Sequence, residues 1–175
     1  TDSLAVSEFV KNSKPVDIII HCAAIAHGEK PPKNYTIAGF NSVMIVNLLS
    51  AFSQKQPHWI FLSSVSVYGD AYCQNHIPIE VSPLSSDDYG RGKLHDECAL
   101  LKACNHLDIL RLMPTYKTYD NKDIKKRVFI PKTRVKLRIL PAPKYSLCHV
   151  NTVVEKVSRC LDQMPGRRLH QVGDE

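Results

Sequence analysis

The sequence predicts an α/β fold in which a mostly parallel, doubly wound sheet carries helices on both faces. Short apolar runs alternate along the chain with longer segments of helical periodicity. Continuous apolar runs are typical of parallel strands that are buried on both faces, and their alternation with helices is typical of such sheets. With 175 residues, 43% of them hydrophobic, the chain can bury about 70% of its unfolded surface around one core.

The N-terminal third is expected to hold a helix, a strand and a second helix. Asp2 or Ser3 can cap the first helix, whose apolar side chains would face a core: Leu4, Phe9 and Val10. Residues 16–20 form the first strand. The second helix is marked by apolar side chains at helical spacing: Val43, Val46, Leu49 and Phe52.

The middle of the chain predicts a strand, a long loop and a helix. Residues 59–63 form the strand, after Pro57 helps to close the preceding turn. The polar, proline-containing loop over residues 70–86 is longer than most connections, which is typical of active-site loops. Residues 89–104 then form a helix with an apolar stripe of Leu94, Cys98 and Leu101.

The C-terminal third predicts a strand over residues 107–112, which Pro114 ends, and a last short strand over residues 169–172. Between them lies a helix whose apolar face consists of Val150, Val153, Val154, Val157 and Leu161. The alternation in residues 134–139 fits an exposed strand with its basic side in water.

Tyr89 and Lys93 stand four residues apart, so on a helix they share one face. Ser64 lies upstream, at the end of the strand over residues 59–63. A phenol, an ammonium and a hydroxyl can together move a proton on and off a sugar or alcohol oxygen. Making a tyrosine a base near pH 7 requires roughly 4 kcal/mol, which a nearby ammonium, a bound nicotinamide cation and a partly dry pocket can supply. Taken alone, the pair is a weak signal that chance often produces, and a solvated helix face is the simpler interpretation.

The order of these segments resembles the extended short-chain dehydrogenase/reductase family, of the NAD-dependent nucleotide-sugar epimerase/dehydratase type. Residues 16–24 are similar to the family's fourth strand with its small-residue loop, and residues 59–69 to its fifth strand with the Ser-Ser-x-x-Val-Tyr-Gly signature. Residues 107–116 are similar to its sixth strand, residues 145–154 to its late His-Val-x-Asp helix start, and residues 168–174 to its final strand. The resemblance implies a partial Rossmann-like fold. Residues 1–116 would be part of a dinucleotide-binding domain, and residues 117–175 a substrate-binding portion whose final helix and strand return to the main sheet.

The resemblance assigns functions to individual side chains. Ser64, Tyr89 and Lys93 take the catalytic positions. The cofactor-binding positions are Ala23, Ala24, Asn41, Ser63, Tyr89, Lys93 and Met113, and the substrate-binding positions are Ser66, Thr115 and Arg138. Simpler interpretations stay open, because the two alanines can be a tight strand end, the asparagine a plain helix cap and Ser66 an ordinary loop serine.

The family's glycine-rich turn, which binds the cofactor pyrophosphate at a helix N-terminus, does not occur among the seven glycines. We therefore expect the 175 residues to be a fragment or a truncated gene product that binds NAD poorly on its own. The choice between NAD and NADP depends on the same segment, so the sequence leaves it open.

The first functional hypothesis is an NAD(P)-dependent oxidoreductase or epimerase acting on a nucleotide sugar. Tyr89 would take the hydroxyl proton while hydride passes to the nicotinamide. The alternatives are a reductase of a non-sugar alcohol or ketone, as in the related steroid and flavonoid branches, and a non-catalytic remnant or regulatory protein.

Several positions depart from the family pattern. Pro114, Tyr145 and Thr152 stand where the family commonly has an asparagine, a phosphate-binding arginine and an aspartate. Val65 and Ser66 replace the Asp-Glu pair of sugar 4,6-dehydratases. Elimination of water needs an additional acid and base, so that subclass is disfavoured.

Basic residues are concentrated in residues 117–144, which contain ten Lys/Arg and two Asp, a charge of +8. The whole chain carries +6, so the remainder carries −2. In the resembled family this segment covers the nucleotide diphosphate, which cations favour; a solvated basic face is the alternative. No nucleic-acid motif or aromatic interleaving accompanies the charge, so nucleic acid is not expected as a partner.

The six cysteines and eight histidines show no zinc-finger or other metal-ligand spacing, so no metal site and reduced thiols are expected. The chain contains no run of about 18 apolar residues, so no membrane span is expected. Because the thiols are expected to be reduced, we expect a cytoplasmic protein. Residues 16–20 would form an uncapped apolar edge of the sheet. Self-association, as in a homodimer, or association with the missing N-terminal segment is therefore expected.

Overall fold

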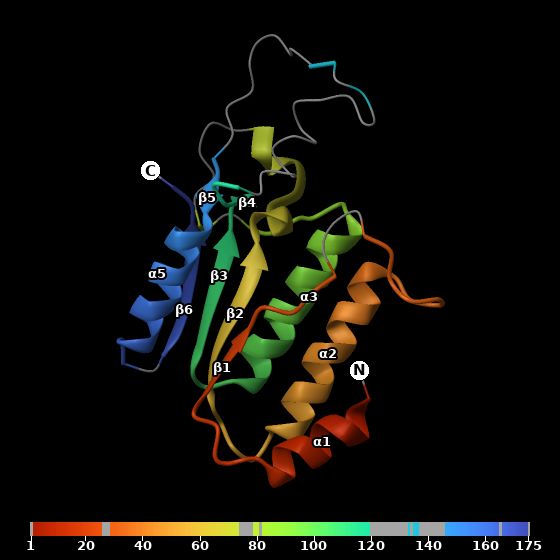
Figure 1. The fold of residues 1–175 in the computed structure, drawn as a ribbon, viewed down its shortest axis with the longest axis vertical. Helices are drawn as coiled ribbons and strands as arrows, with labels where there is room; N and C mark the ends of the chain where they lie inside the picture. The colour runs from red at the N-terminus through yellow and green to blue at the C-terminus, as the bar shows by residue number, and fades with distance from the viewer. Residues whose placement is uncertain are drawn as a thin grey trace.

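The computed structural model describes residues 2–25, 29–73, 79–80, 82–119, 133, 135–136, 146–164 and 166–174. The elements, labelled as in Figure 1, are α1 (Ser3–Asn12), β1 (Ile18–His21), α2 (Ile37–Ala51), β2 (His58–Ser64), the 3₁₀ segment η1 (Val65–Cys73), α3 (Asp88–Ala103), β3 (Leu107–Leu112), β4 (Thr115–Tyr116), β5 (Cys148–His149), α5 (Val150–Leu161) and β6 (Arg167–Val172).

The main sheet is parallel, with strand order β1-β2-β3-β6. Its register aligns Ile18 with His58, Trp59 with Leu107, and Leu107 with Arg167. Helices α2 and α3 cover one face and α5 covers the other (Figure 1). The prediction of a parallel α/β sheet with helices on both faces is confirmed.

Strand alternation divides the core into two layers. Trp59, Phe61 and Ile109 point toward α2 and α3, where they pack with Ile45 and Leu100. The intervening side chains point toward α5 and form a second cluster of Ile60, Leu110, Val153, Cys160 and Val172. Both layers are dry and apolar at mid-strand, so the polar side chains of the sheet gather near its two ends.

The close approach of α3 to α2 depends on Gly92. A Cβ at this position would lie 2.7 Å from the Cα of Ala38 on α2, which is closer than two carbon atoms can approach. The side chain of Asp88, at the start of α3, accepts a hydrogen bond from the Ala38 amide at 3.2 Å. These contacts fix the N-terminal half of α3 against the start of α2.

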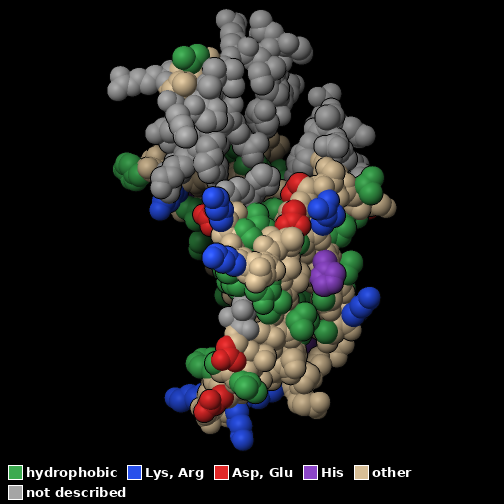
Figure 2. Space-filling view, turned by 90° about the vertical axis from the view of Figure 1, so that its right-hand side faces the viewer, with side chains coloured by type: hydrophobic (Ala, Val, Ile, Leu, Met, Phe, Trp, Pro, Cys, Tyr) green, Lys and Arg blue, Asp and Glu red, His purple; other side chains and the backbone are tan. Residues whose placement is uncertain are grey.

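Helix α1 differs from its prediction. Asp2 caps it as expected, accepting hydrogen bonds from the amides of Leu4 and Ala5. However, Leu4 and Phe9 are 80% and 70% exposed, and of the predicted apolar face only Val10 is buried. The expectation that all three face a core was wrong, because α1 packs mainly against α2, at the outside of the helical layer (Figure 1). Figure 2 shows the side of the molecule that carries these two helices, where hydrophobic side chains lie among scattered charges.

Strand β1 is the edge of the sheet, and among the described residues it pairs only with β2. Ile19 packs against the core below α2 and α3. Ile18 and Ile20 point the other way and are 40% and 44% exposed. The apolar edge expected from residues 16–20 is therefore present, and the self-association inferred from it stays a prediction.

Candidate functional site

The predicted site residues come from the carboxyl ends of the strands. In a parallel sheet the carboxyl ends of all strands lie at the same end of the sheet, which is the upper end in Figure 1. Ser64 is the last residue of β2, and Met113 follows β3 directly. Ala23 and Ala24 lie just beyond the end of β1. The sheet thus brings these sites, far apart in sequence, to the same edge.

Ser64 and Ser66 form a linked pair of hydroxyl groups. The Ser64 hydroxyl donates to the Ser66 Oγ at 3.0 Å and accepts from the Ser66 backbone amide at 3.1 Å. Both side chains are half-buried. The backbone amide fixes the orientation of Ser64, so the pair presents a defined array of donors and acceptors at the end of β2.

The first turn of α3 packs directly against this serine segment. Asp87 caps α3 by accepting from the Gly90 amide at 2.9 Å. A Cβ on Gly90 would lie 2.4 Å from the Ser66 carbonyl oxygen and 2.1 Å from the Ser85 Oγ. Only glycine fits this contact, and it brings Tyr89, the preceding residue, to the end of β2.

Lys93 is buried beneath Tyr89, with 4% of its surface exposed. Its Nζ donates to the Leu62 carbonyl oxygen at 2.7 Å and lies 4.6 Å from the centroid of the Phe61 ring. The distance from Nζ to the centroid of the Tyr89 ring is 5.9 Å. The shared helix face predicted for the two side chains is present, and the solvated alternative is wrong for Lys93.

Burial changes the proton affinities of both side chains. It lowers the pKa of Lys93 to about 8, against the opposing attraction of Asp96 and Glu97. Burial, and then the negative charge of Asp87, raise the pKa of Tyr89 above its ordinary value. The Lys93 ammonium does not offset these effects, so in the protein alone Tyr89 is a neutral phenol at pH 7.

Asn41 fixes the loop that follows β1. It is buried on α2, where its amide donates to the Ile25 carbonyl oxygen at 3.1 Å and accepts from the Ile25 amide at 2.8 Å. The residue that caps α2 is Thr36, so the interpretation of Asn41 as a plain helix cap is wrong. Asn41 holds the backbone of the loop, while Ala23 is exposed and Ala24 is half-buried.

His21, the last residue of β1, was not expected in the site. It is 6% exposed, and neither ring nitrogen has a hydrogen-bond partner among the described residues. Burial, and then the positive charge of Lys93, lower the pKa of His21 to about 4, so the ring is neutral at pH 7. A polar residue that ends an apolar strand was the available signal for this position.

A second group that sequence analysis missed lies on the α3 side of the sheet. Ser63 was expected to contact a cofactor, but its hydroxyl donates to Glu97 Oε1 at 2.6 Å. Arg111 donates to both oxygens of Glu97, at 3.1 and 2.7 Å. Arg111 and Gln171 each also donate to the Tyr68 hydroxyl, at 2.8 Å.

This buried network joins β2, η1, α3, β3 and β6 directly below the serine pair. The sequence signal was an arginine within an apolar strand, since a buried charge requires a partner. Within the network, Glu97 holds Arg111 and Ser63 in place.

Of the remaining predicted site residues, the structure describes two, Met113 and Thr115. Met113 is half-buried against Gly173, and Thr115, exposed on β4, donates to the Met113 carbonyl oxygen at 3.1 Å. Arg138 and most of the basic segment lie outside the described residues. The predicted division at residues 116 and 117 is not tested by this structure.

Comparison with solved structures shows related folds. UDP-N-acetylglucosamine 4-epimerase from Bacillus cereus aligns with a TM-score of 0.72 and 17% identity, over 99% of this chain and 62% of the other. MoeE5 in complex with UDP-glucuronic acid and NAD aligns at 0.75 and 20%, over 98% and 60%. dTDP-4-dehydrorhamnose reductase from Bacillus anthracis in complex with NADP aligns at 0.72 and 18%, over 99% and 61%.

The chain therefore spans about 60% of the length of these structures, and identities at this level show the fold alone. No curated protein sequence matched. None of the helices in the described part of the chain is long and apolar enough to cross a membrane. The model of the NAD dependent epimerase/dehydratase family matches residues 1–131, three quarters of the sequence, and the chain belongs to that family.

Proposed function

We propose that the protein is an NAD(P)-dependent epimerase or oxidoreductase that acts on a nucleotide sugar, with Ser64, Tyr89 and Lys93 as its catalytic residues. The observation that carries the proposal is the burial of Lys93 below Tyr89. Its Nζ is bound to the strand that ends in Ser64. A lysine on an ordinary solvated helix face would not be desolvated in this way.

The residues at the carboxyl ends of the strands fit the nicotinamide end of a dinucleotide. Asn41 holds the backbone of the loop of small residues that follows β1. The buried nitrogens of His21 lie at the same edge and need a partner from outside the described residues. The 175 residues contain no glycine-rich turn for the pyrophosphate. When bound, the cofactor supplies a nicotinamide ring that accepts or returns hydride.

The side chains of the chain itself would perform the proton transfer. Ser64, oriented by the Ser66 amide, is suited to hold the reacting oxygen of the substrate. Tyr89 moves the proton between its own hydroxyl and that oxygen, while the cation of Lys93 stabilises the phenolate form. Transfer of hydride away from a sugar carbon and back to its opposite face gives epimerisation.

A reductase is the second candidate, and the neutral phenol of Tyr89 is compatible with it. A neutral phenol is already loaded to donate a proton to a carbonyl oxygen, as reduction requires, whereas oxidation first requires its deprotonation. One similar structure is a reductase crystallised with NADP. The substrate would be a nucleotide sugar in either case, since the similar structure of MoeE5 is a complex with UDP-glucuronic acid. The positive charge of residues 117–144 would favour its diphosphate.

The test uses the product of the whole gene, in the wild-type, Tyr89→Phe and Lys93→Met forms. Isothermal titration measures NAD and NADP affinity, and absorbance at the reduced nicotinamide band follows single turnovers with UDP-sugars. We expect Tyr89→Phe to keep the cofactor affinity and lose turnover. Lys93→Met should lose turnover and part of the affinity. Normal turnover of Tyr89→Phe would refute the assignment, and absence of any dinucleotide binding would support a non-catalytic protein.

A further inference from the structure

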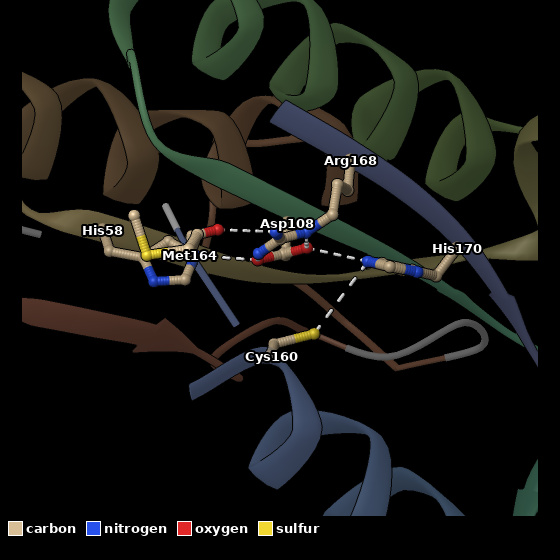
Figure 3. Close-up of polar contacts among 6 residues, drawn as sticks. All are labelled: His58, Asp108, Cys160, Met164, Arg168 and His170. Atoms are coloured by element: carbon tan, nitrogen blue, oxygen red, sulfur yellow. Dashed lines mark hydrogen bonds and ion pairs between the residues drawn. The ribbon is translucent and has the colours of Figure 1, made fainter. Parts of the chain in front are cut away.

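A second cluster of polar side chains surrounds Asp108, at the start of β3. It lies near the amino ends of the strands, at the opposite end of the sheet from Ser64, and on the face that α5 covers. Figure 3 shows side chains from β2, β6 and the end of α5 converging on the carboxylate. Asp108 is fully buried, so this group is separate from the candidate site in both position and accessibility.

The carboxylate of Asp108 is held in a fixed position. Arg168 donates to both of its oxygens at 2.7 Å, from Nε and from Nη2. His58 and His170 each place an Nε2 near one oxygen, at 2.8 and 2.7 Å respectively. Burial raises the pKa of Asp108, but the hydrogen bonds from Arg168, His170 and His58 outweigh it and keep the pKa well below its ordinary value. The group is therefore a permanent anion.

Cys160 completes the cluster from α5. It is fully buried, and its Sγ lies 3.9 Å from His170 Nε2, the nitrogen that contacts Asp108. This separation is too long for a strong hydrogen bond, and the nitrogen is already engaged by the carboxylate. An oxygen of Asp108 on β3, a nitrogen of His170 on β6 and the sulfur of Cys160 on α5 thus lie within 4.8 Å of one another.

We propose that Asp108, Cys160 and His170 form a binding site for Zn²⁺ or a chemically similar divalent transition metal. Carboxylate, imidazole and thiolate are the three ligand types that zinc uses in proteins. In a tetrahedral zinc site the ligand atoms lie about 3.4–3.6 Å apart, given metal–ligand distances of about 2.0–2.3 Å. The present His170–Asp108 and Cys160–His170 separations of 2.7 and 3.9 Å bracket that value. Small side-chain rotations would therefore suffice.

The charges of the cluster also suit a divalent ion. For Nε2 to bind the metal, neutral His170 would carry its proton on Nδ1 instead, and Cys160 would bind as a thiolate after losing its proton to solvent. Asp108 and the thiolate then offset the two positive charges of the metal, and partly exposed Arg168 leaves the cluster a net charge of +1. Arg168 keeps its contact with the carboxylate from the side, with 27% of its side chain exposed to water and a further hydrogen bond to the Met164 carbonyl oxygen.

Arg168 and His58 would be the outer groups that orient the ligands, since metal-bound carboxylates are commonly held by further hydrogen bonds. The fourth ligand would be a water molecule, or the imidazole of His58 after a small rotation of its side chain. The site would join β3, β6 and α5 and stabilise the C-terminal part of the sheet. It does not depend on the proposed enzymatic activity. The wide separation of the ligands in sequence explains why the spacing of cysteines and histidines had predicted no metal site.

The experiment uses the protein freed of metal by a chelator under reducing conditions and titrated with Co²⁺. We expect one equivalent to produce visible d–d bands and a near-ultraviolet thiolate-to-cobalt band, both displaced by Zn²⁺. Cys160→Ser should abolish the near-ultraviolet band, and His170→Gln should weaken Co²⁺ affinity at least about tenfold. Cys98→Ser, at an exposed cysteine of α3, is the matched control and should retain the band.

A second measurement guards against misfolded variants. X-ray absorption of the Zn²⁺-loaded wild-type protein should show one sulfur ligand, with nitrogen and oxygen in the other positions. The proposal is overturned if Co²⁺ gives no thiolate band, if Cys160→Ser keeps that band, or if the bound zinc has no sulfur or several sulfur ligands.

Discussion

His21 and Lys93 at the candidate site, and Asp108 at the other end of the sheet, are buried polar groups with opposite kinds of surroundings. At the carboxyl end, the nitrogens of His21 lack hydrogen-bond partners among the described residues, and Lys93 has a single carbonyl acceptor for its desolvated ammonium. At the amino end, Asp108 receives two hydrogen bonds from Arg168 and contacts two imidazoles. Burial dominates the shifted proton affinities at the first end, and pairing dominates them at the second.

This difference separates a site whose buried groups need an additional molecule from a cluster whose carboxylate is already paired within the protein when no ligand is bound. Incompletely paired buried groups destabilise the free protein and gain energy when a ligand completes them. A carboxylate surrounded by donors stabilises the protein already, and it becomes costly only when one partner is removed. Substitutions at the carboxyl end should therefore affect function first, and substitutions at the amino end should affect stability first.

The largest expected effect is on catalysis at the carboxyl end. Tyr89→Phe retains the ring but removes the hydroxyl that transfers the proton, so turnover should fall by about 10²–10⁴-fold. The melting temperature should stay close to that of the wild type. Steady-state kinetics and circular dichroism on the same samples test both statements. A large loss of stability with turnover preserved would reverse the contrast between the two ends.

At the amino end, Asp108→Asn should destabilise the protein by about 3 kcal/mol, because it leaves the half-buried Arg168 beside a neutral amide in place of the fully buried carboxylate. Urea unfolding at neutral pH, in metal-free buffer, measures this loss. Asp162→Asn, at the exposed end of α5, is the control and should change the free energy of unfolding by less than about 0.5 kcal/mol. Equal effects of the two substitutions would show that the cluster contributes little.

The third effect is a pH dependence that comes from Lys93. Its pKa is about 8 in the folded protein and 10.5 when exposed, so the unfolded chain binds the extra proton between these values. The free energy of unfolding should therefore rise with pH across this window, by roughly 3 kcal/mol from this group. Lys93→Met should lack that rise. Urea titrations of both proteins from pH 7.5 to 10.5 give the difference, and parallel curves would contradict the assigned burial.

An effect of similar size, at acid pH, belongs to His21, whose pKa is lowered from 6.5 to about 4. Since the unfolded chain binds this proton first as the pH falls, stability should decrease between pH 6.5 and 4. His21→Phe should flatten that part of the profile and, by removing the unpaired nitrogens, stabilise the protein near pH 5. His95→Phe, at a largely exposed imidazole, is the control. An unchanged acid slope in His21→Phe would contradict the prediction.

Local patterns in the sequence predicted most of the fold. The strand at residues 107–112 was predicted with the observed bounds, because a short apolar run between polar turns has few alternative structures. Helix α3 was also predicted within about one residue at each end. The predicted burial of Leu4 and Phe9 was wrong, because periodicity shows that a helix has an apolar face but not whether anything covers that face.

The candidate site was predictable only where its residues lie close together in sequence. Tyr89 and Lys93 are one helical turn apart, and Ser64 stands at a strand end. Glu97 and Arg111 were missed as a pair because they meet only after α3 packs on β3. His58, Asp108 and His170 come from three strands whose order in the sheet no single sequence pattern specifies.

The glycines at positions 90 and 92 have a consequence for motion. Each lies in the first turns of α3, where glycine lowers intrinsic helix stability by about 1 kcal/mol relative to alanine. The contacts that exclude a side chain there, with Ser66 and Ala38, must supply the order that the local sequence does not. The start of α3 should therefore open more readily than its second half. Amide hydrogens near Tyr89 should exchange with solvent well before those around Leu100, and a ligand that bridges α3 and β2 should slow them selectively.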